Sequence, residues 1–225
     1  MTQLDNIKLN LILELNPWDF TEDPYPYDKD NTIENRYKWW KHVMTSVGIN
    51  QIEPISKSNY VNTNSISNSD LMIILKDHME RNGPGEYSDS MSPLYGGVLL
   101  LNNDEIMISP NCCTDMVDHY QWLEIEPTKI PKQIWIGHPW IFYKTEGTEI
   151  IFSNFVEKNS EDLLPEDLIL KGSLNQILEE AEKLKEYVSN FETQVRNCLT
   201  EIGHEKPGAM AKCLIYGECD AFRID

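Results

Sequence analysis

The sequence predicts an α+β protein, with a central, mainly antiparallel sheet built from hairpins, flanking helices and a long C-terminal amphipathic helix. Three observations predict this class. Apolar strand-like runs at 97–109 surround a turn of Asn and Asp residues, a second hairpin pattern follows at 140–152, and residues 173–203 repeat apolar side chains at helical spacing. Since 225 residues can bury a substantial core, we expect a single domain over residues 1–225.

The first third of the chain predicts one strand and two helices. Leucines alternate over residues 8–15, which is a strand pattern, although a short helix competes with it. A helix is expected to begin near Thr32, which can cap it, and to end at Gly48. The Ser- and Asn-rich residues 49–69 predict a polar connector, after which a second helix ends at Gly83.

The middle of the chain predicts two hairpins joined by a short helix. Residues 102–104 are Asn-Asn-Asp, whose side chains tolerate the positive φ of a tight turn. A short helix is expected over 115–123, and Glu146-Gly147 is the expected second turn. Gly137 lies between two strand-like runs, so we expect a bulge or a close chain crossing there.

The C-terminal third predicts the longest helix. Ser173 and Gln176 have the spacing of a capping box, and the apolar stripe then continues to Gly203. A single apolar face means that this helix packs along a body and does not stand alone. Beyond it, the apolar segment at 213–216 is expected to add an edge strand.

The charge of the chain restricts its partners. It carries 37 acidic and 19 basic residues, a formal net charge of −18. Such a field repels nucleic-acid phosphates and anionic lipids and attracts basic partners, although acidity also simply keeps proteins soluble. The sequence has no nucleotide-binding fingerprint and no apolar run as long as a membrane span. We therefore expect neither a nucleic acid nor a membrane as partner.

The N-terminal residues and the cysteines predict a cytoplasmic protein. The first 15 residues have no basic region and no small-residue cleavage site, so they do not form a signal peptide. The number of cysteines is odd, and none of them has CxxC spacing. We expect reduced thiols rather than disulfides at Cys112, Cys113, Cys198, Cys213 and Cys219.

A cysteine with a histidine can form a nucleophile and its base, which draws attention to Cys112, Cys113 and His138. A catalytic thiolate needs nearby positive charge, whereas the neighbours here are acidic and raise a thiol pKa. Adjacent residues on an extended segment also point to opposite sides, so at most one of the two cysteines can serve. A structural role is the favoured interpretation, and catalysis is the alternative.

Two further constellations have simpler explanations. Asp115 and Asp118 have the spacing of an acid–base pair on a helix, but 37 acidic residues make such pairs common, and a solvated acidic face is favoured. A zinc site is disfavoured because adjacent cysteines present two ligands poorly to a tetrahedral ion. Its four candidate ligands are Cys112, Cys113, His119 and His138. We expect neither a metal nor another cofactor.

The loop at 16–31 combines aromatic and acidic side chains and contains three prolines. Aromatic residues supply most of the affinity of protein interfaces, and prolines reduce the entropy lost on binding. The competing interpretation is that these aromatic residues fold back onto the core. The predicted partner-binding residues are Trp18, Asp19, Phe20, Glu22, Asp23, Tyr25, Tyr27, Asp28 and Asp30.

Residues 97–155 resemble bacterial toxin-immunity proteins of the SUKH (Smi1/Knr4-like) type. The likeness lies in the hairpin GVLLLNNDEIMI, a polar connection that contains Trp122, the segment WIFYKTEGTEIIFS and a helix toward the C-terminus. The N-terminal helix followed by a glycine-bearing turn that is typical of the family is not found, and this chain is longer than many members. The resemblance implies an α+β fold and the neutralisation of a cognate toxin, and it transfers no catalytic residue.

The sequence therefore favours an acidic cytoplasmic binding protein of the immunity or inhibitor type, which covers the active site of a possibly basic toxin. Charge complementarity would raise the association rate with such a partner. The alternative is a small hydrolase or transferase that uses Cys112 or Cys113 with His138.

Overall fold

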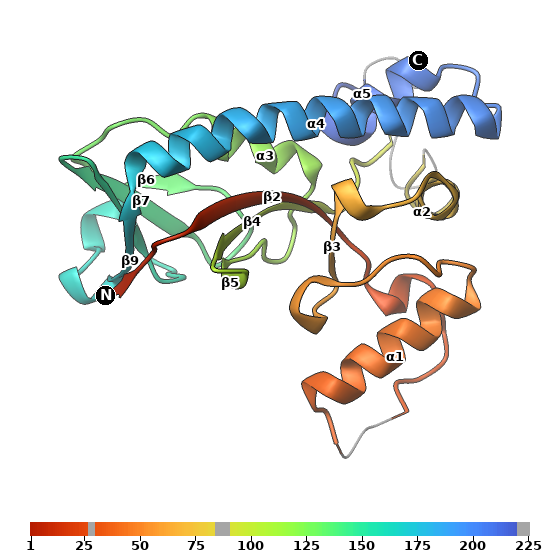
Figure 1. The fold of residues 1–225 in the computed structure, drawn as a ribbon, viewed down its shortest axis with the longest axis horizontal. Helices are drawn as coiled ribbons and strands as arrows, with labels where there is room; N and C mark the ends of the chain where they lie inside the picture. The colour runs from red at the N-terminus through yellow and green to blue at the C-terminus, as the bar shows by residue number, and fades with distance from the viewer. Residues whose placement is uncertain (27–29, 84–90, 220–225) are drawn as a thin grey trace. The chain divides into compact units, whose positions relative to one another are not determined.

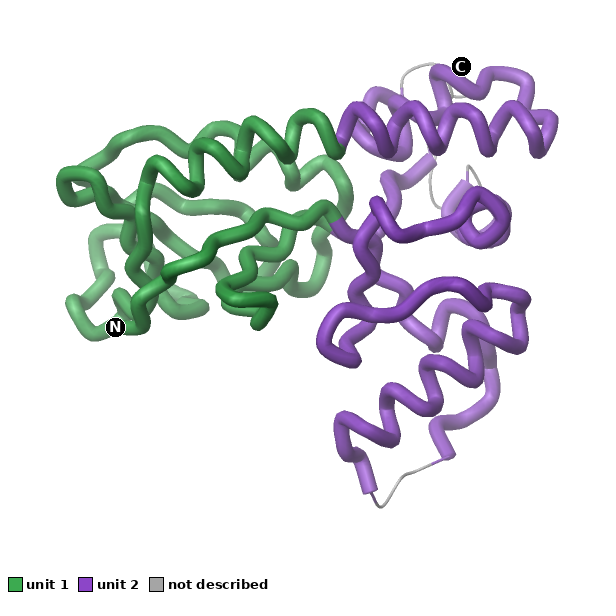
Figure 2. The backbone as a smooth tube through the Cα atoms, in the orientation of Figure 1, with its two compact units in different colours: residues 1–11, 97–187 green, residues 12–96, 188–225 purple. Residues whose placement is uncertain are grey.

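The predicted α+β class is confirmed. A computed structural model describes residues 1–26, 30–83 and 91–219, and within them five α-helices accompany two mostly antiparallel sheets (Figure 1). The chain forms two compact units (Figure 2). Unit 1 consists of Met1–Leu11 and Gly97–Tyr187, and unit 2 consists of Ile12–Gly96 and Val188–Asp225.

Unit 1 contains a five-stranded sheet of order β1-β9-β8-β7-β6. Its strands are β1 (Thr2–Gln3), β6 (Lys132–Ile134), β7 (Ile141–Glu146), β8 (Glu149–Ser153) and β9 (Leu168–Ser173). All of its neighbours are antiparallel except β1 and β9, which are parallel. Since Glu146 pairs with Glu149, the second hairpin turn is Gly147-Thr148, one residue later than predicted. Gly147 has φ +64°, a conformation that glycine adopts without strain.

The first predicted hairpin is confirmed. It consists of β4 (Gly96–Asn102) and β5 (Glu105–Ile108), and Asn102 pairs with Glu105 across the turn. The two turn residues, Asn103 and Asp104, have φ of +52° and +67°, as their side chains allow. These strands belong to a four-stranded sheet of order β3-β2-β4-β5.

The predicted N-terminal strand and the first two helices are also confirmed. They are β2 (Ile7–Glu14), α1 (Ile33–Ser46) and α2 (Asn68–Asn82). Thr32 caps α1 through its side chain, which accepts the N–H of Asn35. The side chain of Ser67 caps α2, so this helix begins slightly earlier than the sequence suggests.

The polar connector contains more regular structure than its composition indicates. It includes β3 (Tyr60–Asn62) between two short 3₁₀ helices, η2 (Ile55–Lys57) and η3 (Thr63–Ser65). Val61 is buried and pairs with Leu13 of β2, so one buried apolar side chain anchors a segment rich in Ser and Asn. Such a strand of three residues carries too little alternation to be recognised from sequence.

The predicted C-terminal helix is α4 (Leu174–Ile202), which follows β9 directly. Within unit 1 the carboxylate of Glu180 accepts the N–H of Leu9, and within unit 2 Gln194 donates to the carbonyl of Ile66. The buried stripe of α4 comprises Leu174, Ile177, Ala181, Leu184, Val188, Phe191, Val195, Cys198 and Leu199. Among the described helices, none has the length and apolar content to cross a membrane.

The expected edge strand at 213–216 is wrong, because this segment lies in a helix, α5 (Pro207–Tyr216). Pro207 suits the first turn of a helix, and Gly217 ends it in the left-handed conformation with φ +70°. The apolar run is too short to distinguish a strand from a helix by its pattern. The buried residues of α5 are Met210, Ala211, Cys213, Leu214 and Ile215.

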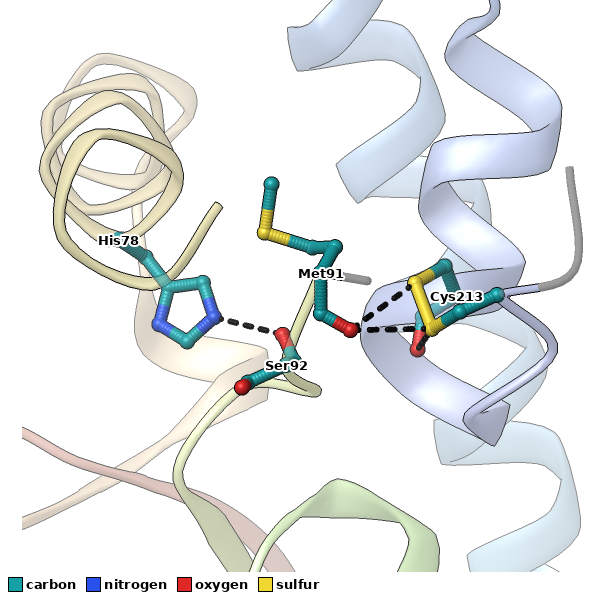
Figure 3. The surroundings of a disulfide bond; sticks show 5 residues. His78, Met91, Ser92 and Cys213 are labelled. Atoms are coloured by element: carbon teal, nitrogen blue, oxygen red, sulfur yellow. Dashed lines mark hydrogen bonds between the residues drawn. A yellow bond between two sulfur atoms is a disulfide. The ribbon is translucent and has the colours of Figure 1, made fainter. Parts of the chain in front are cut away.

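The expectation that all five cysteines are reduced is also wrong, because Cys213 and Cys219 form a disulfide. The left-handed Gly217 turns the chain back, so the two Cα atoms lie 4.4 Å apart. Both sulfurs lie close to the carbonyl oxygen of Met91, at 3.6 and 3.2 Å, and next to Met91 the ring of His78 contacts the carbonyl of Ser92 (Figure 3). The end of the helix brings together two cysteines whose spacing in the sequence does not indicate a bond.

The buried stripe of α4 predicts a clear difference between two neighbouring positions. Leu184 is fully buried, so Leu184→Ala should lower the free energy of unfolding by about 2–5 kcal/mol. Lys185 is exposed and forms an ion pair with the exposed Glu182, so Lys185→Ala should change it by less than about 0.5 kcal/mol. Urea unfolding followed by circular dichroism measures both, and equal effects would contradict the assignment of the buried face.

Candidate functional site

The candidate site begins where β2 ends. Pro17–Asp19 forms a 3₁₀ turn, η1, which the side chain of Asn16 caps by accepting the N–H of Trp18. Pro17 is buried in this turn, whereas Trp18 is 53% exposed. The local hydrogen bond and the fixed proline dihedral therefore hold a large aromatic side chain in solvent, where it costs free energy unless a partner covers it.

Three aromatic rings meet beside this turn. Trp39 of α1 is almost fully buried, and its ring centroid lies 4.7 Å from that of Trp18 and 5.3 Å from that of Tyr25. Both contacts are edge-to-face, at interplanar angles of 60° and 79°, which is a favourable arrangement for aromatic quadrupoles. The rings line a pocket of about 230 Å³ together with polar groups. Its lining residues are Asn16, Pro17, Trp18, Tyr25, Asn31, Arg36, Trp39 and Asn59.

The predicted partner-binding residues divide into two sets. Those that are exposed, as a binding surface requires, are Trp18, Glu22, Asp23 and Asp30. Those that are half-buried and contact the body of unit 2 are Asp19, Phe20 and Tyr25. The interpretation that aromatic residues fold back onto the core holds for Phe20 and Tyr25, and partner binding by the exposed residues stays a prediction. Tyr27 and Asp28 lie outside the described residues.

Next to the aromatic pocket lies a cluster of charges around Arg81 of α2. Arg81 forms ion pairs with Asp19, at 3.2 Å, and with Asp77, and its guanidinium lies 5.7 Å from the ring centroid of Phe20. Burial raises the pKa of the Glu14 carboxyl, and the nearby Asp19 raises it further. Burial likewise raises the pKa of Asp19, against the opposing effect of Arg81. This cluster fixes the start of the loop to α2.

Sequence reasoning missed Trp39, Arg36 and Arg81. Helical spacing assigns Trp40 to the buried stripe of α1, and Trp39 lies about 100° away from it around the same helix. The adjacent Trp39 and Trp40 therefore indicate that α1 presents an aromatic side chain next to the face that packs in the core. Nothing in the sequence signals that Arg81 pairs with Asp19, since the two are 62 positions apart (81 − 19).

The alternative catalytic residues also meet, in unit 1. Cys112 and His138 form an isolated antiparallel bridge, and the thiol of Cys112 donates to the backbone carbonyl of His138, at 3.4 Å. The imidazole instead packs edge-on against Trp140 and has Nε2 3.9 Å from a carboxylate oxygen of Glu157. A hydrogen bond to Cys112 raises the pKa of the Cys113 thiol. The raised pKa of Cys113 favours its thiol over the thiolate that a nucleophile needs.

The acidic pair at 115 and 118 caps the turn η4 (Met116–Asp118) ahead of α3 (His119–Leu123). The Asp115 side chain accepts the N–H of Val117, and that of Asp118 accepts the N–H of Asp115. Both carboxyls are half-buried rather than solvated as expected, and burial raises the pKa of Asp118 to about 6. Within the described parts of the chain, no group of three or more His, Cys, Asp and Glu residues is placed to hold a metal ion.

Comparisons with known proteins give no relative for this chain. No family model, no curated protein and no solved structure matches it.

The raised pKa of the Cys113 thiol predicts slow alkylation of this residue. At neutral pH, iodoacetamide should label the exposed Cys113 no faster than a simple thiol peptide, because a hydrogen bond to Cys112 raises the pKa of its thiol. The rate should increase steeply as the pH rises into the alkaline range. A His138→Ala variant should behave as the wild type. Fast labelling at neutral pH that His138→Ala abolishes would instead support the cysteine-dependent enzyme.

The raised pKa of Asp118 predicts a pH-dependent stability. Its unfolded-state pKa is about 3.9, so the carboxyl favours the folded state most at low pH, and this contribution is lost as pH rises toward about 6. Between these values, the free energy of unfolding of the wild type should fall relative to that of Asp118→Asn, whose amide oxygen can still accept the N–H of Asp115. Urea titrations across this range measure the difference, and a constant difference would contradict the raised pKa.

Proposed function

We propose that this chain is a protein-binding inhibitor of the immunity type, which uses the surface around Trp18 to cover a basic protein partner. The observation that carries the proposal is the exposed Trp18 ring, which contacts Trp39 at the edge of a pocket and is followed along the loop by exposed acidic residues. We further propose that the protein is soluble and cytoplasmic and that its partner is a cognate toxin, which it neutralises.

The geometry of the pocket suits a binding hot spot. Hot spots are commonly tryptophans beside pockets, and each contributes about 2 kcal/mol or more. The capped η1 turn and the contact with Trp39 already restrict the Trp18 side chain, so little conformational entropy is lost when a partner covers it. The pocket of about 230 Å³ has room for one inserted side chain of that partner.

Charge supports a basic partner. The exposed acids Glu22, Asp23 and Asp30 follow Trp18 in the same loop, and the whole chain carries a net charge of −18. A field of this sign accelerates encounter with a basic protein and repels nucleic acid and anionic lipid.

The association rate should therefore fall with rising salt, as expected for steering by exposed charges.

Support for an immunity role comes from the resemblance of residues 97–155 to SUKH-type immunity proteins. That segment forms the hairpin of β4 and β5 and three strands of the five-stranded sheet of unit 1. Genes for immunity proteins lie beside those of their toxins, so the product of the neighbouring gene is the first partner to test. The enzyme alternative has less support, because the thiol of Cys112 contacts a backbone carbonyl and that of Cys113 contacts Cys112, and neither contact supplies a base.

The proposal predicts that Trp18 dominates binding. The partner to test is the product of the adjacent gene, produced with this chain and purified as a complex. Trp18→Ala in this chain should lower the affinity for that partner about 30-fold or more, the loss expected for a hot spot of about 2 kcal/mol. The matched control is Trp135→Ala, which removes a 39% exposed tryptophan from unit 1 and should leave the affinity unchanged. Isothermal titration calorimetry measures both.

Two outcomes would contradict the proposal at different levels. Unchanged affinity after combined alanine substitution of Trp18, Glu22, Asp23 and Asp30 would show that another surface binds. The immunity role itself would be rejected by two results together. This chain would form no complex with the product of the neighbouring gene, and it would not protect cells that produce that product.

A further inference from the structure

Two of the five cysteines form an exposed adjacent pair, Cys112 and Cys113. The other three do not present a free thiol to solvent in the folded chain, since Cys198 is buried and Cys213 is bonded to Cys219. The chain therefore offers solvent one dithiol.

The backbone at Cys113 departs from the extended conformation that would turn the two adjacent side chains to opposite sides. Cys113 has φ +66°, in the left-handed region that β-strand alternation does not use. The thiol of Cys112 donates to the carbonyl of His138, and the pKa of the neighbouring Cys113 thiol is raised by a hydrogen bond to Cys112. This arrangement has a chemical consequence, because two exposed thiols on adjacent residues can react as a pair.

The backbone around the pair is held at several points. The N–H of Asn111 donates to the carbonyl of Ile136, at 2.7 Å, and its side-chain amide donates to the carbonyl of Pro139, at 3.0 Å. The hydroxyl of Thr114 donates to the carbonyl of Asn111. Gly137 crosses so close to Cys112 that a Cβ there would lie 2.3 Å from the Cys112 carbonyl oxygen. The dithiol is thus presented by a fixed loop.

We propose that Cys112 and Cys113 form a reversible thiol–disulfide exchange site, which small-molecule disulfides oxidise to a bond between the two adjacent residues. The thiolate of Cys112 attacks one sulfur of the small disulfide, which gives a mixed disulfide and releases one small thiolate. The deprotonated sulfur of Cys113 then attacks the Cys112 sulfur and releases the second. The pair loses two electrons and two protons, and the small disulfide is reduced to two thiols.

The bond so formed is readily reversed. The peptide between Cys112 and Cys113 is trans, which fixes their Cα atoms about 3.8 Å apart. Disulfides usually join Cα atoms about 4.4–6.8 Å apart, so an adjacent bond is strained, and strained, exposed disulfides are the easily reduced ones. The site therefore responds to the ambient thiol–disulfide ratio and does not serve as a permanent cross-link.

Oxidation also changes the loop. A disulfide sulfur has no proton to donate, so the hydrogen bond from Cys112 to the His138 carbonyl is lost. The bridge between Cys112 and His138 then keeps only its backbone contacts. Oxidation should therefore weaken the close backbone contact between Gly137 and Cys112.

The experiment exposes the full chain to buffers of oxidised and reduced glutathione in varied ratio, at mildly alkaline pH so that thiolate forms. The reaction is quenched with N-ethylmaleimide and the chain is digested for mass spectrometry. The peptide with Cys112 and Cys113 should lose two hydrogen atoms and both alkylation sites as the ratio rises, and excess reduced glutathione should restore them. Cys198→Ser, which changes a buried thiol, should not alter this response.

Single variants separate ring closure from simple adduct formation. Cys112→Ser and Cys113→Ser should each retain one glutathione on the remaining cysteine, because no second thiol displaces it. If the wild type also accumulates only glutathione adducts, or keeps both alkylation sites at every ratio, the exchange site is disproved. Circular dichroism of each variant establishes that the fold is intact, so a negative result counts against the proposal.

Discussion

The burial of one apolar stripe on α4 is the interaction on which both compact units depend. Ile177 and Leu184 belong to the core of unit 1, and Phe191 and Leu199 belong to that of unit 2. Each contributes a side chain whose burial stabilises the fold by about 1.5–3 kcal/mol. The helix is long enough to serve both units because its stripe repeats at helical spacing without interruption.

Residues with left-handed backbone conformation determine where several groups of this fold lie. Asn103 and Asp104 close a hairpin, and Gly217 ends α5 before the disulfide. These three residues tolerate positive φ well, and their turns are structural. Cys113 is not such a residue, although its backbone has the same conformation. Its conformation depends on the hydrogen bonds of the surrounding loop.

The acidic charge acts differently in the interior and at the surface. Glu14, Asp19 and Asp118 are partly buried, and the raised pKa of each means that its negative charge is costly in the folded state. The acidic residues Glu22, Asp23 and Asp30 after Trp18 are instead exposed at the surface. The partly buried and the exposed carboxylates therefore lie in separate electrostatic environments.

The sequence by itself determined the elements whose signals are local. The cap at Thr32, the Asn-Asp turn and the long stripe after Ser173 each lie within a few residues of what they specify, so their bounds were predicted almost correctly. It also marked the loop after residue 16 and the cysteine pair as unusual. Only the tertiary structure decided which side chains meet, as Trp18 meets Trp39 and as Arg81 pairs with Asp19. These contacts depend on how segments that are apart in the sequence pack together in the folded chain. Sequence periodicity carries no information about that packing.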